Sequence, residues 1–299
     1  MKLHGIFAPL TTPFEPDGGV SLPHLRDNIK RYNQTGLAGY AINGSTSESV
    51  LLRWDEVYRI WEAARETAAP NKILIAGSGA ESTAETIEHT NRAASIGYAV
   101  ALVRTPSFYK PAMSEDALAG HYLRVADGAR IPIMVYSVPV FTHVSVEAPL
   151  IGRVSKHPNV VGMKDSSGDV QGVADIIAAA PKEFQTLVGS ASTLYESLEK
   201  GAVGAILALA CTFPELCVEI YEASRAGESA KAHSLAQQLI APAKMLGPQY
   251  GIAGLKYALE RLGYFGGPAR LPLLPVGEAA RREIDDLLSN LTAQSAHLL

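Results

Sequence analysis

A lysine that closes an apolar run could act as a nucleophile in this chain. Residues 159–163 read Asn-Val-Val-Gly-Met, Lys164 comes next, and the sequence continues as Asp-Ser-Ser-Gly. A lysine at the carboxyl end of a buried strand, beside a loop of small residues, can lose its proton and attack a carbonyl carbon. The simpler alternative is a strand-end lysine whose ammonium group reaches water along its alkyl chain. Which of these two roles Lys164 has depends on the other segments that lie near it in the fold.

Two further segments place polar groups after apolar runs. Residues 43–49 read Asn-Gly-Ser-Thr-Ser-Glu-Ser, and Tyr136 closes a run of its own. Small residues with free N–H groups at the start of a helix can hold a carboxylate, and a phenol can carry protons. The alternatives are an ordinary helix N-cap for the serines and a water-exposed hydroxyl for Tyr136. If the ends of these runs meet, an amine, a phenol and several hydroxyls share one site.

The apolar runs themselves predict the elements that would bring these groups together. Eight short runs rich in Val, Ile, Leu and Ala predict strands at residues 5–10, 39–42, 73–76, 99–103, 131–136, 160–163, 184–188 and 203–207. Their apolar residues are consecutive, which is typical of parallel strands covered on both faces. Stretches with helical periodicity lie between them, among them residues 22–35, 54–69, 82–96 and 114–126.

Eight alternating strands and helices favour an α/β fold, the (β/α)8 barrel known as the TIM barrel. A doubly wound sheet is the alternative, but no G-x-G-x-x-G follows the first strand. A helix predicted at 215–225 completes the barrel, and helices at 230–245, 255–262 and 278–291 form a C-terminal three-helix extension. We therefore expect a catalytic barrel over residues 1–225 and a helical domain over residues 226–299. In a barrel, Ser45, Tyr136 and Lys164 would face one mouth.

Composition excludes several classes of function. Of the 299 residues, 47% are hydrophobic and 19% are charged, which is typical of a globular protein. The formal net charge is −4 and no long basic run occurs, which argues against nucleic acid and anionic membranes as partners. The two cysteines, Cys211 and Cys217, lack the spacing of a zinc site or a disulfide framework. Without a signal-peptide pattern or a membrane-length apolar run, the expected location is the cytoplasm.

At this point the motifs resemble a known family, the dihydrodipicolinate synthase and N-acetylneuraminate lyase group of class I aldolases. Four motifs carry the resemblance: residues 8–14 (Ala-Pro-Leu-Thr-Thr-Pro-Phe), 44–49, 136–139 (Tyr-Ser-Val-Pro) and 162–165 (Gly-Met-Lys-Asp). They occur in order and span nearly the whole chain. From residue 157 onward the sequence looks most similar to 4-hydroxy-2-oxoglutarate aldolase.

The resemblance implies a Schiff base between Lys164 and the ketone of pyruvate or another 2-oxo acid. It also implies that Tyr136 carries protons, that Ser45 assists it, and that Thr46 and Gly44 help to hold the substrate carboxylate. No metal or organic cofactor is then needed, the partners are small molecules, and the assembly is a homotetramer. Four more positions match residues that line the family's pocket: Ser166, Gly189, Ser190 and Ile206.

Two departures from the family pattern concern the proton relay and the second substrate. Many members have a tyrosine that crosses a dimer interface at the position of Phe108, so the relay lacks this phenol unless Tyr109 replaces it. Dihydrodipicolinate synthases have an arginine that pairs with the carboxylate of aspartate semialdehyde at the position of Phe141. His143, which replaces a customary glycine, could be a general acid or an aromatic wall.

Three functions remain open from the sequence. The first is an aldolase most like 4-hydroxy-2-oxoglutarate aldolase, for which Phe141 suggests a neutral or partly apolar aldehyde or a 2-oxo sugar acid as substrate. The alternative is a dihydrodipicolinate synthase, which the loss of the arginine weakens. The rival class is a non-catalytic sensor that binds a 2-oxo acid at Lys164.

Overall fold

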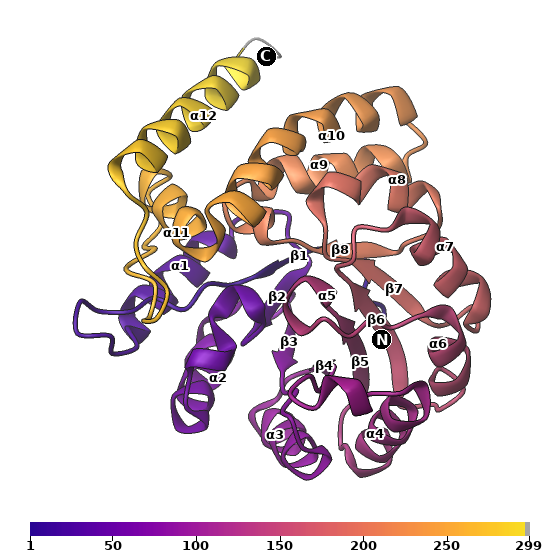
Figure 1. The fold of residues 1–299 in the computed structure, drawn as a ribbon. Coiled ribbons are helices and arrows are strands. Elements are labelled where there is room, and N and C mark those ends of the chain that lie inside the picture. The colour runs from indigo at the N-terminus through magenta and orange to yellow at the C-terminus, as the bar shows by residue number, and fades with distance from the viewer. Residues whose placement is uncertain (297–299) are drawn as a thin grey trace.

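The protein is a closed barrel of eight parallel strands, and the predicted TIM barrel is therefore confirmed. The computed structural model describes residues 1–296, with side chains as far as residue 291. Figure 1 shows the strands at the centre with helices around them. In chain order the strands are β1 Gly5–Pro9, β2 Gly39–Ile42, β3 Ile73–Gly77, β4 Val100–Arg104, β5 Ile133–Ser137, β6 Val160–Asp165, β7 Gln185–Val188 and β8 Gly204–Ile206.

Helices follow the strands and cover the outside of the barrel, and their bounds differ by a few residues from those predicted. The covering helices are α1 Leu22–Tyr32, α2 Trp54–Thr67, α3 Thr83–Ile96, α4 Glu115–Gly128, α6 Ala148–Val154, α7 Val170–Ala179, α8 Leu194–Glu199 and α9 Pro214–Arg225. A one-turn helix, α5 Pro139–Thr142, follows β5. The C-terminal extension consists of α10 Ser229–Lys244, a π-helical turn over Met245–Gln249, α11 Gly251–Arg261 and α12 Glu278–Ala296.

Local sequence signals set several of the helix ends. The Ser82 hydroxyl accepts a hydrogen bond from Glu85 N at 3.1 Å and begins α3, which ends at Gly97 with a φ of 95°. Ser114 begins α4 in the same way, through Ala117 N at 3.2 Å. A serine N-cap supplies an acceptor to a first-turn N–H, and a left-handed residue that follows the last turn suits glycine.

The interior of the barrel is a cluster that consists mostly of strand residues, and no side chain of a described helix belongs to it. Phe7, Leu102, Met134, Leu187 and Ile206 belong to it. Their neighbours in sequence, such as Val103 and Val135, belong to a second cluster that packs against the helices. Side chains therefore alternate between inside and outside along each strand, as the period of a β-strand requires. This alternation decides which residues at the strand ends point into the mouth.

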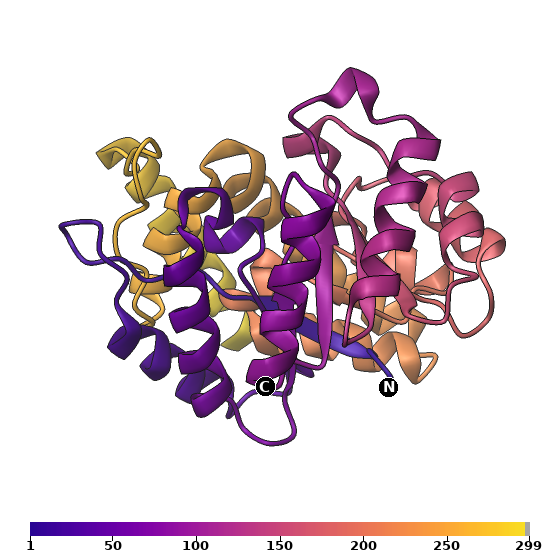
Figure 2. The same cartoon turned by 90° about the horizontal axis from the view of Figure 1, so that it is seen from below.

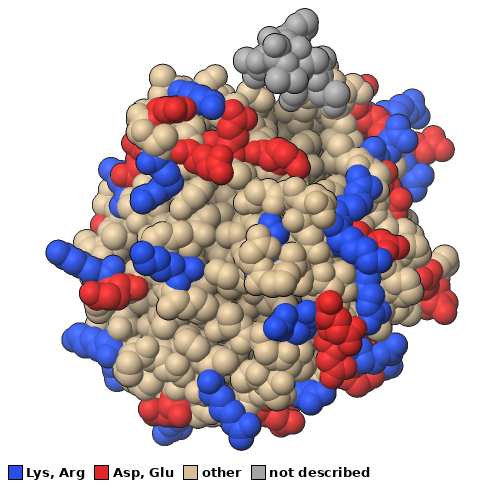
Figure 3. Space-filling view, turned by 180° about the vertical axis from the view of Figure 1, so that it is seen from behind, with Lys and Arg blue, Asp and Glu red and all other residues tan. Residues whose placement is uncertain are grey.

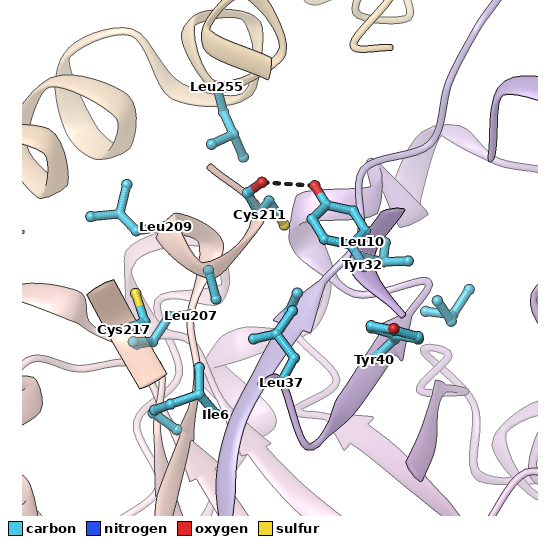
Figure 4. Packing of buried hydrophobic residues seen from close by; sticks show 14 of the residues in the cluster. Ile6, Leu10, Tyr32, Leu37, Tyr40, Leu207, Leu209, Cys211, Cys217 and Leu255 are labelled. Carbon is cyan, nitrogen blue, oxygen red and sulfur yellow. Dashed lines mark hydrogen bonds between the residues drawn. The ribbon is translucent and has the colours of Figure 1, made fainter. Parts of the chain in front are cut away.

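The C-terminal extension shares the outer core with the barrel. Leu255 of α11 belongs to the same cluster as Ile6, Leu207 and Tyr40 of the barrel (Figure 4). In that cluster the Tyr32 hydroxyl donates to the carbonyl oxygen of Cys211 at 2.7 Å. The expected domain boundary after residue 225 stays a prediction, because these contacts join the two parts into one core without marking where either ends.

The extension also contacts α1 through polar groups. Figure 2 shows the C-terminal helices at one side of the barrel, beside the indigo N-terminal segment. There the Asn28 side chain donates to Phe265 O at 2.7 Å and accepts from Phe265 N at 2.9 Å. One asparagine thus satisfies both backbone groups of a residue in the loop after α11.

A buried ion pair joins the extension to the loop after β2. Lys256 Nζ of α11 lies 2.6 Å from Glu48 Oε1, and both side chains are at most 1% exposed. Arg270 N donates to the other carboxylate oxygen of Glu48 at 2.7 Å. Lys256 also donates to Pro268 O at 2.8 Å and lies over the Phe14 ring. Burial lowers the pKa of Lys256, while the neighbouring carboxylate opposes that change.

The surface carries charges of both signs. On the face drawn in Figure 3, Lys and Arg are interspersed with Asp and Glu. Across the described residues, no helix combines the length and the apolar character that a membrane span requires. The cytoplasmic location stays a prediction.

Replacing Lys256 by methionine should destabilise the protein strongly. The Glu48 carboxylate would remain buried without its cation, and breaking a buried pair in this way costs about 3 to 5 kcal/mol. Denaturant unfolding followed by circular dichroism measures the change. Lys231→Met is the control, because Lys231 pairs with Glu219 at 3.0 Å on the surface and both side chains are about half exposed. A Lys256→Met midpoint equal to that of the control would contradict the structural role of the pair.

Candidate active site

Lys164 and Tyr136 lie side by side inside the barrel mouth. They are register partners in the pairing of β5 with β6. Since Tyr136 belongs to the interior cluster and Met163 to the outer one, Lys164 also points inward. Its Nζ lies 4.5 Å from the centroid of the Tyr136 ring, and the residue is only 4% exposed. No carboxylate of the described residues lies within ion-pair distance of this amine, which lies over the face of the Tyr136 ring.

Ser45 reaches Tyr136 from the opposite side of the mouth. The Ser45 hydroxyl lies 3.2 Å from the Tyr136 hydroxyl, close enough for one to donate to the other. Both residues line a small cavity together with Asn43 and Gly44. Lys164 is not among the lining residues, because its amine lies against the face of the Tyr136 ring. Tyr136 thus contacts both the amine and the cavity.

The loop after β2 offers a set of unpaired donors. The backbone N–H groups of Ser45 and Thr46 have no acceptor among the described residues. Thr46 is 7% exposed, and Gly44 has open space where a Cβ would be. Two N–H groups and two hydroxyls on one short segment can surround a carboxylate. The structure thus brings Gly44, Ser45 and Thr46 to the mouth with Tyr136 and Lys164.

The serines of this loop do not form the ordinary helix N-cap that was the alternative for them. Two 3₁₀ turns, Ser45–Ser47 and Ser49–Leu51, flank Glu48, which has a left-handed φ of 59°. The α-helix begins at Trp54, as predicted. Ser47 does not cap a helix; its hydroxyl donates to Leu10 O at 2.6 Å and accepts from Asn43 N at 3.0 Å. A left-handed non-glycine residue needs support from its surroundings, which the buried ion pair with Lys256 supplies.

Four further predicted positions lie on β6, β7 and β8 or just after them. A Cβ at Gly189 would lie 1.9 Å from Ser166 Oγ and 2.8 Å from Lys164 Cε, so only glycine leaves room for both side chains. Ile206 is fully buried in the interior cluster. Ser190 lies farther out, with its hydroxyl 3.0 Å from that of Ser192. Gly189 and Ser166 are therefore next to the amine, whereas Ser190 points to the rim.

Asp165 points away from Lys164. Its carboxylate accepts from Ser167 N at 3.0 Å and lines a separate cavity outside the strands, beside α6 and α7. Burial raises the pKa of Asp165, although hydrogen bonds from Ser167 act in the opposite direction. The alternation of the strand thus keeps this carboxylate on the outer face of β6, away from the nucleophile.

The predicted relay and substrate residues at the rim do not reach the cavity of their own chain. Phe108 and Tyr109 are 77% and 72% exposed, and they contact each other edge to face with centroids 5.0 Å apart. Phe141 is 66% exposed, on the one-turn helix α5. His143 is exposed and has a φ of 52°, which suits the glycine that the family places there. Phe141 and His143 line neither cavity described above.

Arg104 and Asn43 also line the cavity, although neither was among the predicted site residues. Arg104 ends β4 and is the register partner of Tyr136, and Asn43 follows β2 with a φ of 68°. Both line the cavity with Ser45. Asn43 donates to Gly77 O at 2.7 Å, while its side-chain oxygen is buried without a partner among the described residues. The alternation Val100, Leu102, Arg104 was visible in the sequence and could have indicated an arginine in the mouth.

Known protein sequences resemble this chain over nearly its whole length. The model of the "Dihydrodipicolinate synthetase family" matches residues 2–291. A 4-hydroxy-tetrahydrodipicolinate synthase of an Exiguobacterium species is 30% identical over 280 residues, which cover 94% of this chain and 95% of that protein.

Solved structures agree with the sequence comparison. The 4-hydroxy-tetrahydrodipicolinate synthase of Methylacidiphilum fumariolicum superposes with a TM-score of 0.94 at 26% identity, over 99% of this chain and 98% of that one. A dihydrodipicolinate synthase of Acinetobacter baumannii in complex with pyruvate gives a TM-score of 0.92 at 28% identity, over 96% and 98% of the two chains. The resemblance seen in the sequence motifs therefore extends over the whole fold.

Replacing Gly189 by alanine should disable the amine while leaving the fold intact. The new methyl group would overlap Ser166 Oγ and crowd Lys164 Cε, so the lysine side chain must move. We expect the rate of covalent adduct formation with pyruvate, followed by borohydride reduction and mass spectrometry, to fall at least about tenfold, as small misplacements of a reacting group do.

Gly120→Ala is the matched control, because nothing lies within 4 Å of a Cβ at that helical position. It should leave adduct formation unchanged. Equal rates in the two variants would show that the space at Gly189 is not needed.

Proposed function

This chain belongs to the dihydrodipicolinate synthetase family of pyruvate-dependent Schiff-base enzymes, and on that premise we propose that it is a 4-hydroxy-tetrahydrodipicolinate synthase that forms its Schiff base through Lys164. The observation that carries the proposal is the alignment of three groups in one mouth. Lys164 Nζ lies 4.5 Å from the centre of the Tyr136 ring, and the Tyr136 hydroxyl lies 3.2 Å from Ser45. An amine, a phenol and a hydroxyl in this order are what imine formation requires.

In the proposed reaction the neutral amine of Lys164 attacks C2 of pyruvate. The ketone oxygen takes up one proton from the amine nitrogen and a second from a proton donor, leaves as water, and the product is an iminium ion. Loss of a proton from C3 gives an enamine, which bonds to the carbonyl carbon of an aldehyde while the aldehyde oxygen takes up a proton and becomes a hydroxyl. Water then hydrolyses the new iminium ion and restores the lysine. The position of the amine supports this role, because it lies in the barrel mouth beside the Tyr136 ring.

Tyr136 is the proposed proton carrier for these steps. Its hydroxyl lines the cavity while its ring faces the amine, so one side chain touches both the nucleophile and the space for substrate. Ser45 is within hydrogen-bonding distance and can exchange a proton with it. The free N–H groups of Ser45 and Thr46 support binding of the pyruvate carboxylate on the far side of the mouth.

The names of the relatives favour synthesis over 4-hydroxy-2-oxoglutarate cleavage, which the sequence placed first. Both reactions use the same lysine enamine, so the residues of the mouth alone do not separate them. We assign the condensation because relatives that match nearly the whole chain carry that name. The homotetramer stays a prediction; the exposed pair Phe108 and Tyr109 supports an interface at the rim, since large exposed apolar side chains often mark one.

Borohydride reduction in the presence of pyruvate should trap an adduct on Lys164. Intact mass and peptide mapping locate the modified residue. Lys164→Arg should give no adduct, whereas the control Lys200→Arg, at an exposed lysine, should behave as the unaltered protein does. No adduct on Lys164 would remove the proposed mechanism. An adduct without turnover of any aldehyde, and without pyruvate release from 4-hydroxy-2-oxo acids, would favour the sensor.

Replacing Tyr136 by phenylalanine should lower kcat by about 10²-fold to 10⁴-fold, the usual contribution of a positioned proton carrier. Ser45→Ala should have a smaller effect, because water can replace one hydroxyl partner. Steady-state kinetics with pyruvate and aspartate semialdehyde measure both changes. Tyr195→Phe is the control, because that ring contacts His233 on the outer helices. A Tyr136→Phe enzyme with the kcat of the control would rule out the phenol as the proton carrier.

A further inference from the structure

We propose that Arg104 binds the carboxylate of the aldehyde substrate, and that it thereby takes the place of the arginine that is absent at Phe141. This inference rests on the proposed function and names the substrate class of the same site, an aldehyde that carries a carboxylate. Phe141 itself is not available for any such role, because it is 66% exposed and does not line the cavity. The cation comes instead from the end of a neighbouring strand.

The register of three adjacent strands places Arg104 beside the catalytic pair. Arg104 pairs with Tyr136 between β4 and β5, and Tyr136 pairs with Lys164 between β5 and β6. Val100 and Leu102 of β4 belong to the interior cluster, so the next residue in the alternation, Arg104, also points inward. An enamine on Lys164 would thus have a phenol next to it and a guanidinium one strand farther on.

Gly79, two residues after β3, makes room for this side chain. Gly77 and Gly79 line the cavity with Arg104, Ser45 and Tyr136. A Cβ at Gly79 would lie 2.6 Å from Arg104 N and 2.9 Å from Arg104 Cγ. The backbone after β3 therefore packs closely against the arginine and leaves the guanidinium within the mouth, where the side chain is 20% exposed.

The guanidinium has one edge fixed and the other free. Nη1 donates to Glu81 Oε1 at 2.7 Å and lies 3.4 Å from Thr105 O. Nε and Nη2 have no hydrogen-bond partner among the described residues. An arginine held at one edge can offer its remaining N–H groups to a carboxylate with little loss of side-chain freedom.

Glu81, which holds one edge of the guanidinium, also accepts hydrogen bonds from the backbone of the loop after β4. Its second oxygen accepts from Ser107 N at 2.8 Å and from Phe108 N at 2.9 Å. Although burial raises the pKa of Glu81, these hydrogen bonds and Arg104 together lower it, so this carboxylate stays ionised. The same contacts suggest the competing explanation, in which Arg104 only holds the loop after β4. The experiment must separate the two.

The experiment compares two aldehydes of equal chain length, 4-oxobutanoate and butanal, each with pyruvate. Only the first carries a carboxylate. Removing the charged donor with Arg104→Met should lower kcat/KM for 4-oxobutanoate by about 30-fold or more, the range for a hydrogen bond to a charged group. The value for butanal should change less than about threefold, because the shared chemistry is untouched. Arg104→Lys should restore part of the preference, and Arg26→Met, on the surface of α1, should change neither value.

Glu81→Ala tests the loop explanation. It removes the acceptor of Ser107 and Phe108 and the partner of Arg104 Nη1, but the guanidinium keeps its charge at the end of β4, so the preference for 4-oxobutanoate should fall by less than in Arg104→Met. If Glu81→Ala abolished the preference as fully as Arg104→Met, Arg104 would be a support for the loop only. Equal losses for both aldehydes in Arg104→Met would likewise overturn the inference.

A binding measurement keeps this inference distinct from the proposed function. 4-Hydroxybutanoate is an alcohol that cannot condense, and calorimetry should show that its affinity falls by a similar factor in Arg104→Met. If that loss occurred while pyruvate gave no adduct on Lys164, Arg104 would remain a carboxylate site and the proposed function would fail. If the adduct formed and Arg104→Met bound 4-hydroxybutanoate as well as the unaltered protein does, the proposed function would stand. The role of Arg104 as a carboxylate site would then be wrong.

Discussion

Closure of the eight parallel strands into a barrel is the constraint on which the rest of this structure depends. A closed sheet has an inside and an outside, and every second residue of a strand must point to the inside. On β4, β5 and β6 the last inward positions are Arg104, Tyr136 and Lys164, which are partners in register. The same rule sends Asp165 outward. Lys164 and Asp165 are adjacent in sequence, but their side chains lie on opposite faces of β6.

The second requirement is a rigid loop opposite the lysine, and the C-terminal extension supplies it. The donors of the loop after β2 belong to two short turns around Glu48, whose left-handed backbone needs support. That support is a buried carboxylate held by Lys256 of α11 and by the backbone of Arg270. Helix α11 and the loop that follows it therefore support the site without lining its cavity. A buried pair of this kind is worth more for the conformation that it fixes than for its net stability.

The departures from the family pattern have a common geometric explanation. Phe108 and Phe141 are both strongly exposed at the rim, so replacing polar residues there changes the outer part of the site and leaves the amine, the phenol and the carboxylate loop in place. The role assigned to Arg104 places the missing positive charge deeper, at a strand end, where Gly79 leaves space for it. Moving a cation from a rim loop to a strand end would keep the carboxylate preference while making the site more rigid.

The sequence by itself determined the barrel, the identity of the strands and the three motifs at their ends, because apolar runs and turn residues are local signals. It also determined that Asp165 should turn away, since alternation needs only the strand. The tertiary structure alone decided that Ser45 reaches Tyr136, that Phe141 and His143 stay outside the cavity, and that Glu48 is held by a lysine far along the chain. It also revealed Arg104, whose inward direction depends on register with β5. Such facts come from contacts between distant segments, and no local pattern specifies the distance between two side chains that a closed barrel brings together.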